Sequence, residues 1–512
     1  MLGKLAAQVL DHLEPDKEKQ ARWITPAKQA APSRKLLTAA TRLRQAIDQH
    51  EKIIICGDYD CDGILATAIL TDGLRKAGAT AGFYVPDRIK EGYGLHPHTV
   101  QMAHDKGYGL LVTVDNGVKA EEALELAARL GMCTIVTDHH RMDEEVSADY
   151  VVHPTLMEDD YSTLCGAGLA YELLRTAGLA DNYHRLLAGI ASVGDQMTVT
   201  GETRYLIQAA IRDMNRSPDM HFTPFLRPGP VDETVIAFQI VPRLNAPGRL
   251  SNLANVNNVV RYFLDQDVGR IRSMAMQINE INERRKQISE IMLKQAQDKA
   301  DLDQPVIYVA DASFHEGIIG LVAGSLCART GKPVIVAARN AGGCKASMRG
   351  PEGFDCMQYL AGFGHFSALG GHAQAAGFSF DLEAEAALAA YIKETRAVIE
   401  PAGRTPILLD PALAVVEEIQ GLDDLRPFGP GFPLPEFEIR QPAVARMSDM
   451  SQGRHRRYTL KNGLCCVHFN QSGQDRDRSV CRIHSFIGTP SINVFKGVRS
   501  PQFIIDRIDT RS

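Results

Sequence analysis

The sequence lacks the features that mark membrane and secreted proteins. No apolar run in its 512 residues approaches the ~18 residues that a membrane-spanning helix needs. The ten cysteines form no C-x-x-C pair, which argues against a zinc ribbon or a disulfide framework. The first segment, MLGKLAAQVLDHLEP, carries Asp11 and Glu14 among its apolar residues and does not resemble a signal peptide. We therefore expect a protein of the reducing cytoplasm.

Two common catalytic motifs are also absent. The chain contains no G-x-S-x-G, the turn that presents a nucleophilic serine, and no G-x-x-x-x-G-K-[ST] phosphate-binding loop. What it does contain is ordinary for soluble globular proteins, with 45% hydrophobic and 23% charged residues. A chain of this length is too long for one core, so we expect two to four domains.

The net charge of −6 is unevenly distributed along the chain. Residues 440–512 contain 13 Lys and Arg against 5 Asp and Glu, a balance of +8, which leaves −14 for the residues before them. A basic C-terminal unit on an acidic body favours an anionic partner, with nucleic acid as the leading candidate, although a solvated basic face explains the charge equally well.

Three short β-rich runs end in polar residues. The runs IIIC (53–56), LLVTV (110–114) and TIVT (134–137) alternate with helix-like stretches, which is typical of a doubly wound parallel sheet. They are followed by GDYDCDG, DNG and DHH, respectively. Because ligands bind beyond the carboxyl ends of such strands, we expect the three acidic ends to converge on one site.

A fourth segment, LLAGIASVGDQMTV (186–199), places another carboxylate after an apolar helix. Together the four segments supply Asp58, Asp60, Asp62, Asp115, Asp138, His139, His140 and Asp195. A shell of carboxylates and imidazoles suits Mn²⁺, with Mg²⁺ or Zn²⁺ as alternatives. Two such ions ~3.5–4 Å apart generate a hydroxide nucleophile and bind both oxygens in phosphoryl transfer. Each motif alone is explained as a turn or a helix cap, so the prediction of metal chemistry rests on their joint occurrence.

The rest of the chain suggests further domains. A proline-free segment at about 260–300 has apolar residues on one stripe and predicts a long helix between two domains. A second, smaller α/β pattern follows from Pro305, and strand-like pieces such as RRYTL, CCVHF and FIID then predict a small β-barrel. We expect N-terminal helices plus the catalytic domain at 1–235, the linker and long helix at 236–302, the smaller α/β domain at 303–400 and the barrel at 401–512.

These motifs resemble a known family. GDYDCDG, VTVDNG, VTDHH and ASVGDQMTV have the order and rough spacing of the four motifs of the DHH phosphoesterase superfamily, and FHEGIIGLVAG, KASMRG and LGGHAQAAGF resemble its DHHA1 domain. PDRIKEGYGLH, VPRLNAPGRL and RPFGPGFPLPEF are similar to the RecJ branch, the single-strand-specific 5′→3′ DNA exonucleases. The C-terminal piece, with INVFKGVRSPQFIIDRID, resembles the oligonucleotide-binding (OB) barrel of that branch.

The resemblance implies roles for the acidic cluster. One metal would be held by Asp60 and Asp115, and the other by Asp62, Asp115, His139 and Asp195, with Asp115 bridging. His140 would face the hydroxide or the scissile phosphate, while Asp138 would orient a neighbouring histidine and Asp58 would stand with it outside the direct ligands. Cys56 occupies a position where many DHH proteins have a histidine ligand, which implies altered coordination of the first metal. Both a thiolate ligand and an inert buried thiol remain open for Cys56.

The resemblance also implies contacts to DNA. Arg88, Ser347 and Arg349 match positions linked to a 5′-terminal phosphate, and an arginine fork with a hydroxyl suits phosphate oxygens. His372 would touch the backbone near the cut. Further DNA contacts are expected from Arg243 and Arg249 in VPRLNAPGRL, and from Arg456, Arg457 and Tyr458 in the barrel, where cations interleave with aromatic rings.

The sequence therefore predicts a monomeric exonuclease that uses two Mn²⁺ or Mg²⁺ ions. It would hydrolyse single-stranded DNA from the 5′ end to mononucleotides, in DNA repair and recombination. Single-strand-binding protein and a helicase are expected partners from the family alone, and no membrane is involved. Two alternatives are a phosphodiesterase of the superfamily that acts on short oligonucleotides or cyclic dinucleotides, and a relative that binds single strands without cutting them.

Overall fold

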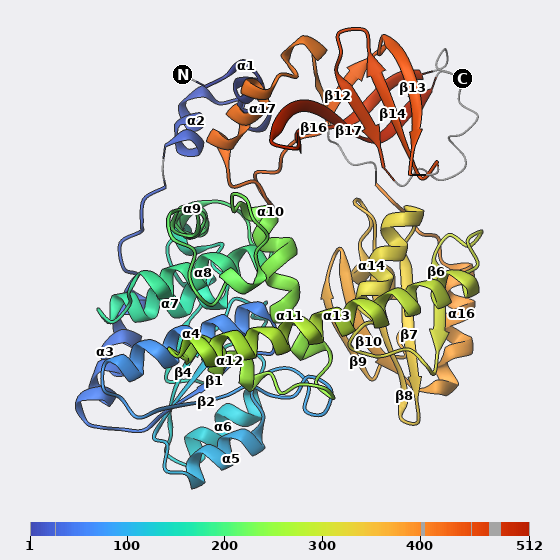
Figure 1. The fold of residues 1–512 in the computed structure, drawn as a ribbon. Helices are drawn as coiled ribbons and strands as arrows, with labels where there is room; N and C mark the ends of the chain where they lie inside the picture. The colour runs from blue at the N-terminus through green and yellow to red at the C-terminus, as the bar shows by residue number, and fades with distance from the viewer. Residues whose placement is uncertain (1, 26, 401–404, 452, 470–482, 511–512) are drawn as a thin grey trace.

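The computed structural model describes residues 2–510 except 26, 401–404, 452 and 470–482, and it shows three bodies (Figure 1). The α/β domain that the sequence predicts to be catalytic, and which we call the catalytic domain, lies at the lower left, with a smaller α/β domain at the right and the C-terminal domain above them. One long helix, α13, runs from the first body to the second. No helix among the described residues is long and apolar enough to cross a membrane.

The catalytic domain is built on a parallel sheet of five strands in the order β2-β1-β3-β4-β5. The predicted runs at 53–56 and 110–114 are β1 and β3, and the run at 134–137 lies within β4. The edge strands β2 and β5 were not predicted. The strands are β1 (Ile53–Cys56), β2 (Ala81–Tyr84), β3 (Leu110–Val114), β4 (Cys133–Thr137) and β5 (Tyr150–Val152).

Helices cover both faces of this sheet, which confirms the doubly wound class. Ile53 and Ile55 of β1 pack in one core with α3, α4, α7 and α8, while Ile54 and Cys56 point to the other face, toward α5 and α6. This alternation follows from the two-residue period of a strand. The helices are α3 (Arg34–Asp48), α4 (Cys61–Lys76), α5 (Pro97–Asp105), α6 (Glu121–Arg129), α7 (Gly166–Thr176), α8 (Asn182–Gly194) and α9 (Gly201–Arg216).

The long connecting helix is confirmed as α13 (Val268–Lys299). Its first half packs into the core of the catalytic domain through Ile271 and Ile278, and its second half packs into the smaller α/β domain through Met292 and Ala296. One apolar stripe thus joins two cores. It is preceded by α10 (Glu233–Val235), the π-helical turn η4 (Ile236–Ile240), α11 (Val241–Arg249) and α12 (Asn257–Leu264).

The smaller domain has a five-stranded sheet in the order β6-β7-β8-β10-β9, in which only the β6–β7 pair is parallel. Helix α14, which contributes to the core shared with α13, packs on β7 and β8. The elements are β6 (Ile307–Asp311), α14 (Ile319–Thr330), β7 (Val334–Asn340), β8 (Gly343–Arg349), α15 (Cys356–Leu360), β9 (Ala368–His372), β10 (Ala375–Phe380) and α16 (Glu385–Glu394).

The C-terminal domain is a strongly curved seven-stranded sheet in the order β11-β12-β16-β17-β15-β14-β13 (Figure 1). Among the described residues its end strands are not hydrogen-bonded to each other, so the expected barrel is an open one. The elements are β11 (Ile407–Leu408), α17 (Val416–Gly421), β12 (Phe437–Arg440), β13 (Val444–Met450), β14 (His455–Leu460), β15 (Cys465–His468), β16 (Ile483–Phe495) and β17 (Val498–Thr510).

The first two helices pack away from the catalytic domain to which the sequence assigned them. Helices α1 (Lys4–Leu13) and α2 (Lys17–Ile24) share a core with the C-terminal sheet, where Leu5, Val9 and Trp23 are buried beside residues from β12, β14 and β17. Their apolar stripe predicts a buried face but does not specify the core that covers it. Helices α1 and α2 therefore belong with the C-terminal domain, although the sequence grouped them with the catalytic domain at 1–235.

A strap at residues 27–31 returns the chain from α2 to the catalytic domain. The backbone N–H of Ala30 donates to Glu202 Oε2 (2.7 Å), and Arg175 donates to both the Ala30 carbonyl (3.0 Å) and Glu172. Burial and repulsion from Glu172 raise the pKa of Glu202 to about 8. The strap is therefore hydrogen-bonded to a carboxyl group whose pKa lies above its ordinary range.

We expect the conformational stability to fall as pH rises from about 5 to about 8.5. A carboxyl whose folded pKa is raised binds its proton more tightly in the folded state, so its contribution is complete near pH 4.5 and is lost as pH passes through about 8. Glu202→Gln, which imitates the protonated acid, should flatten this slope in urea denaturation at the two pH values. Glu290→Gln, on an exposed position of α13, is the matched control. Equal slopes for wild type and Glu202→Gln would contradict the prediction.

Candidate metal centre

The predicted acidic strand ends meet at one edge of the parallel sheet. Strands β1, β3 and β4 are neighbours, and the polar residues that follow them lie at the same edge because the strands are parallel. Asp115 directly follows β3, and its backbone N–H donates to the carbonyl of Thr137 at the end of β4 (3.0 Å). The structure thus brings together the four segments that the sequence singled out.

Two helix N-termini orient the carboxylates that follow β1. Asp60 caps α4, since its Oδ1 accepts hydrogen bonds from the backbone N–H groups of Asp62 (2.9 Å) and Gly63 (3.1 Å). The two carboxylate oxygens of Asp62 accept from Gly166 (2.7 Å) and Ala167 (2.8 Å) at the start of α7. Helix N-termini attract anions, so both carboxylates are held in fixed directions.

Asp115 has a strained backbone and a crowded position. Its φ is 61°, in the left-handed region that few residues other than glycine, Asn and Asp adopt. A Cβ atom at Gly166 would lie 2.4 Å from the Asp115 Cβ, so glycine is required there for α7 to approach. Asn116 ties the strand ends together by donating to the carbonyls of Cys56 (3.1 Å) and Val114 (2.9 Å).

The two histidines have different partners. His139 Nε2 lies 3.1 Å from Asp115 Oδ1, 3.4 Å from Asp195 Oδ2 and 3.8 Å from Asp62 Oδ2, and burial lowers its pKa. An uncharged imidazole is the form that binds a metal. His140 Nδ1 lies 2.8 Å from Asp138 Oδ1. Burial disfavours the charged form of His140, but the hydrogen bond to Asp138 and the negative charges of Asp138, Asp62 and Asp60 together outweigh it and raise the pKa.

Tyr93 is a site residue that the sequence reasoning missed. Its hydroxyl donates to the backbone carbonyl of Asp115 (2.9 Å) and lies 2.9 Å from His140 Nδ1. It belongs to the quoted segment PDRIKEGYGLH, but no spacing rule connects position 93 to either partner. Contacts between distant segments of this kind come only from the tertiary structure.

The chemistry of the donor set fits divalent cations. Burial, followed by repulsion between carboxylates, raises the pKa of Asp58, Asp60 and Asp115 above their ordinary range, and raises that of Asp195 to about 9. One buried oxygen of Asp58, Oδ1, has no hydrogen-bond partner among the residues that the structure describes. A cation at this position would relieve the repulsion and satisfy that oxygen.

The ligand atoms form overlapping sets, each with its atoms within 4.8 Å of one another. The sets are Asp58–Asp60–Asp115, Asp62–His139–Asp195 and Asp115–His139–His140. Asp115 belongs to two of them, and Asp58, which was expected outside the direct ligands, stands beside Asp60 and Asp115. Two adjacent positions for cations are therefore available, with Asp115 between them.

Cys56 is a buried thiol among apolar side chains. It is 3% exposed and packs with Ile54, Leu95 and Val100. Burial raises its pKa to about 12, so the thiol keeps its proton at neutral pH. Of the two alternatives left open for Cys56, these surroundings favour the inert thiol.

A basic cavity of about 430 Å³ lies beside the acidic centre. It is lined by Tyr59, Arg88, Arg249, Ser347 and Arg349, among others. Burial and the other arginines lower the pKa of Arg249 to about 9, and Arg349 donates to the Ser347 hydroxyl (2.8 Å). Three arginines directed at one cavity repel one another, so the cavity favours an anion.

A second cavity of about 890 Å³ joins all three bodies. Asp195 and Gln196 line it from the catalytic domain, Arg349 and His372 from the smaller domain, and Pro430 from the C-terminal domain. Arg349 also lines the basic cavity, so the two cavities meet at this side chain. His372 is exposed on β9, within reach of a molecule bound there.

Two of the residues expected to contact DNA in the C-terminal domain, Tyr458 and Arg456, are buried. Tyr458 is 2% exposed and packs against Phe486 in the core, and Arg456 is 5% exposed with its Nε on Asp449 (2.8 Å). Residues at alternate positions of β14 face inward, whereas Arg457 between them is exposed.

Arg243, which was expected to contact DNA, forms a hydrogen bond within the protein. Its Nε donates to Asn279 of α13 (2.6 Å), which joins α11 to the long helix. Arg249, from the same motif, lines the basic cavity.

Family models match three parts of the chain. The DHH family N-terminal domain matches residues 52–194, the DHHA1 domain matches 303–398, and the RecJ OB domain matches 408–507. The first match contains all but one of the predicted acidic and imidazole ligands, and Asp195 follows its last residue.

Curated relatives and solved structures are similar over most of the chain. The single-stranded-DNA-specific exonucleases RecJ of Bacillus subtilis and Thermus thermophilus are each 30% identical, over 91% and 86% of this chain. The chain spans 62% and 66% of the length of these relatives. The crystal structure of RecJ from Thermus thermophilus in complex with Mn²⁺ superposes with a TM-score of 0.87 at 25% identity, over 100% of this chain and 76% of that one. A crystal structure of exonuclease RecJ bound to manganese covers 71% of this chain and 94% of that one, at 29% identity and a TM-score of 0.62.

Proposed function

The chain belongs to the RecJ family of DHH proteins, and from this premise we propose that it hydrolyses single-stranded DNA from the 5′ end to mononucleotides, in DNA repair and recombination. The observation that carries the proposal is the junction of two cavities at Arg349. A basic cavity suited to one anion is joined there to a larger cavity lined by Asp195 of the acidic centre. This arrangement suits a strand whose terminal phosphate lies among arginines while its next phosphodiester reaches the carboxylates.

The proposed cofactors are two Mn²⁺ or Mg²⁺ ions. Asp58, Asp60 and Asp115 would hold one, and Asp62, Asp115, His139 and Asp195 the other. When bound, such ions supply a hydroxide nucleophile and stabilise the negative charge of the transition state. The extra carboxylate of Asp58 would complete a site that the thiol of Cys56 cannot serve.

The side chains around the ions have separate tasks. His140 Nδ1 faces Asp138, and the raised pKa of the imidazole favours the form in which Nε2 also carries a proton, suited to a hydrogen bond with a phosphate oxygen. Arg88, Arg249 and Arg349 bind the terminal phosphate, with Ser347 as a neutral donor. Fixing one end of the substrate among these groups turns the attack into a positioned reaction.

The proposal is tested with a single-stranded oligonucleotide carrying a label at one end. With Mn²⁺, a 5′ label should be released at once as a mononucleotide, whereas a 3′ label should remain on strands that shorten progressively. A circular single strand, which has no end, should stay intact. Cleavage of the circle, or release of the 3′ label first, would overturn the polarity.

The same assay separates the alternatives. A phosphodiesterase for short substrates would turn over a dinucleotide faster than a long strand. A protein that binds without cutting would shift the strand in a gel while leaving both labels in place. The retained ligand sets of the acidic centre argue for cleavage.

A further inference from the structure

The segment RPFGPGF (426–432) of the C-terminal domain lies directly on the catalytic domain. We call residues 426–432 the Pro430 loop and residues 195–200, which connect α8 to α9, the Asp195 loop. The backbone N–H of Val199 donates to the Pro430 carbonyl (2.8 Å). A Cβ atom at Gly429 would lie 2.6 Å from Val199 Cγ2, and one at Gly431 would lie 2.5 Å from Thr198 Cγ2. The two loops are therefore packed as closely as glycine permits.

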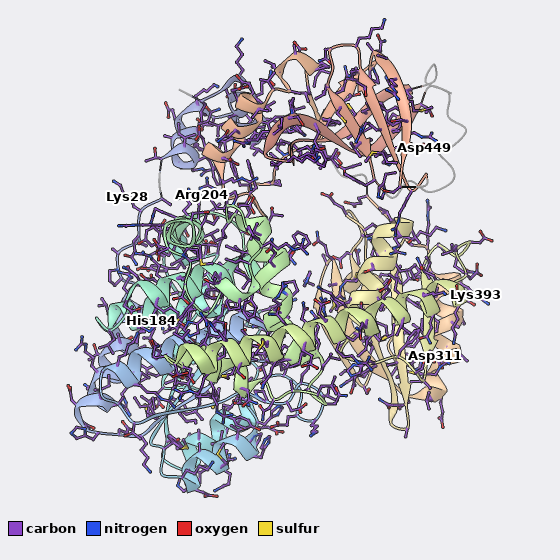
Figure 2. The ribbon with its side chains drawn as sticks, in the orientation of Figure 1. Lys28, His184, Arg204, Asp311, Lys393 and Asp449 are labelled. Atoms are coloured by element: carbon purple, nitrogen blue, oxygen red, sulfur yellow. The ribbon has the colours of Figure 1, made fainter. Side chains whose placement is uncertain are left out.

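Arg204, in the first turn of α9, makes a second set of hydrogen bonds between the catalytic domain and the Pro430 loop region. Its guanidinium donates to the carbonyls of Pro427 (3.0 Å), Leu425 (2.9 Å) and Trp23 (2.9 Å). It is 2% exposed and lies 5.1 Å from the ring centroids of both Trp23 and Phe432. Figure 2 shows Arg204 on the side of the catalytic domain that faces the N-terminal helices and the C-terminal domain.

A third fastening holds the beginning of the Pro430 loop. Glu233 Oε1 accepts a hydrogen bond from the backbone N–H of Phe428 (3.1 Å) and pairs with Arg426, which also lies 3.4 Å from Asp232. Glu233 begins the helical segment that leads to α11, where Asn245 accepts from the backbone N–H of Cys61 (2.6 Å), between Asp60 and Asp62. The Pro430 loop thus rests on elements that hold carboxylates from two of the metal-binding segments.

The Asp195 loop is short and conformationally constrained, so the position of the Asp195 carboxylate depends on the contact at Val199. Asp195 caps the end of α8, and the next residue, Gln196, has a φ of 54° in the left-handed region. Three residues separate Asp195 from the hydrogen bond at Val199. Ligand positions must hold to about 0.5 Å for productive geometry, so a displacement of Val199 reaches the metal centre.

We propose that the Pro430 loop positions Asp195, so that the C-terminal domain sets the metal affinity of a centre whose ligands all lie in another domain. The proposal rests on the proposed function for the role of Asp195 as a metal ligand. The residues of the Pro430 loop act on the metal centre through the position of Asp195. The motif RPFGPGFPLPEF, most of which lies outside the metal centre and the two cavities, would then have the role of positioning Asp195.

The test compares two glycine substitutions that share the same backbone penalty. Gly431→Ala places a methyl group against Thr198 at a φ of 79°, whereas Gly463→Ala adds the same group at a φ of 88° with no atom of a described residue within 4 Å. Mn²⁺ binding to the full chain is measured by calorimetry without DNA. We expect Gly431→Ala to weaken at least one Mn²⁺ site by about 10-fold, the scale for residues that orient a ligand, and Gly463→Ala to leave it unchanged.

A rescue variant distinguishes positioning from general damage. Thr198→Ser removes the Cγ2 atom against which the new methyl group presses, so Gly431→Ala with Thr198→Ser should recover wild-type Mn²⁺ affinity. If Gly431→Ala does not fold, Gly429→Ala with Val199→Ala as its rescue replaces it. Equal Mn²⁺ affinity of the Gly431→Ala and Gly463→Ala proteins, or failure of the rescue, would overturn the inference. Wild-type protein that binds no Mn²⁺ and cuts no DNA would instead refute the proposed function.

Discussion

Replacing Asp115 with asparagine is expected to slow phosphodiester hydrolysis by at least about 10³-fold while single-stranded DNA still binds. Asp115 is 2% exposed and belongs to two of the ligand sets. Loss of a carboxylate shared by two ions removes several kcal/mol of charge stabilisation in the transition state, and each 1.4 kcal/mol corresponds to a factor of ten in rate. Asparagine keeps the shape of the side chain and tolerates the φ of 61°.

The measurement is single-turnover cleavage of a labelled strand at saturating Mn²⁺, beside fluorescence anisotropy for binding. Asp105→Asn, at an exposed position at the end of α5, is the control and should cleave normally. Without metal, the Asp115→Asn protein should melt no earlier than wild type, because one of several repelling carboxylates has been removed. Cleavage at the wild-type rate would show that Asp115 does not bridge the ions.

Replacing Arg88 with alanine is expected to lower kcat/KM for a 5′-phosphorylated strand by about 10- to 100-fold. Hydrogen bonds to charged groups contribute about 1.5–3 kcal/mol, and Arg88 lines the basic cavity at 4.9 Å from the ring of Tyr59. Wild type should cleave the same strand without its 5′-phosphate about as slowly as Arg88→Ala cleaves the phosphorylated strand.

Comparison of the two strands in the two proteins isolates this effect. For the strand that ends in a hydroxyl, Arg88→Ala should change kcat/KM little, because the contact it removes is already missing. Arg272→Ala, on an exposed position of α13, controls for loss of a positive charge. An equal loss on both strands would assign Arg88 to general DNA binding and refute its role in recognising the end.

The sequence was sufficient for those features that depend on local periodicity. Strands β1 and β3 were predicted to the residue because each is a short apolar run between polar turns. Convergence of their acidic ends follows from the direction of parallel strands, so the metal-binding segments were also predictable. The resemblance of motifs along the chain added proposed roles for individual residues, such as Arg88 and Arg349.

Other features depend on contacts that no local pattern specifies. The period of β14 was available in RRYTL, yet which of its faces is buried depends on the strands around it, and Tyr458 lies on the buried face. From the sequence, Asp58 was expected outside the direct ligands, whereas the structure places it beside Asp60 and Asp115. Tyr93 could be connected to Asp115 and His140 only once the loop that carries it was folded over the sheet.

The packing of α1 and α2 has a consequence for the order in which this chain is synthesised. Leu5, Val9 and Trp23 are covered by residues that begin at Leu409, about 385 positions later. At roughly 5–20 residues per second, the ribosome takes about 20–80 s to supply that cover. During this interval the apolar stripe of the first two helices lacks its native cover, and exposed apolar surface of this kind is what chaperones bind. The core of the C-terminal domain is thus complete only when two segments far apart in the sequence have both been synthesised.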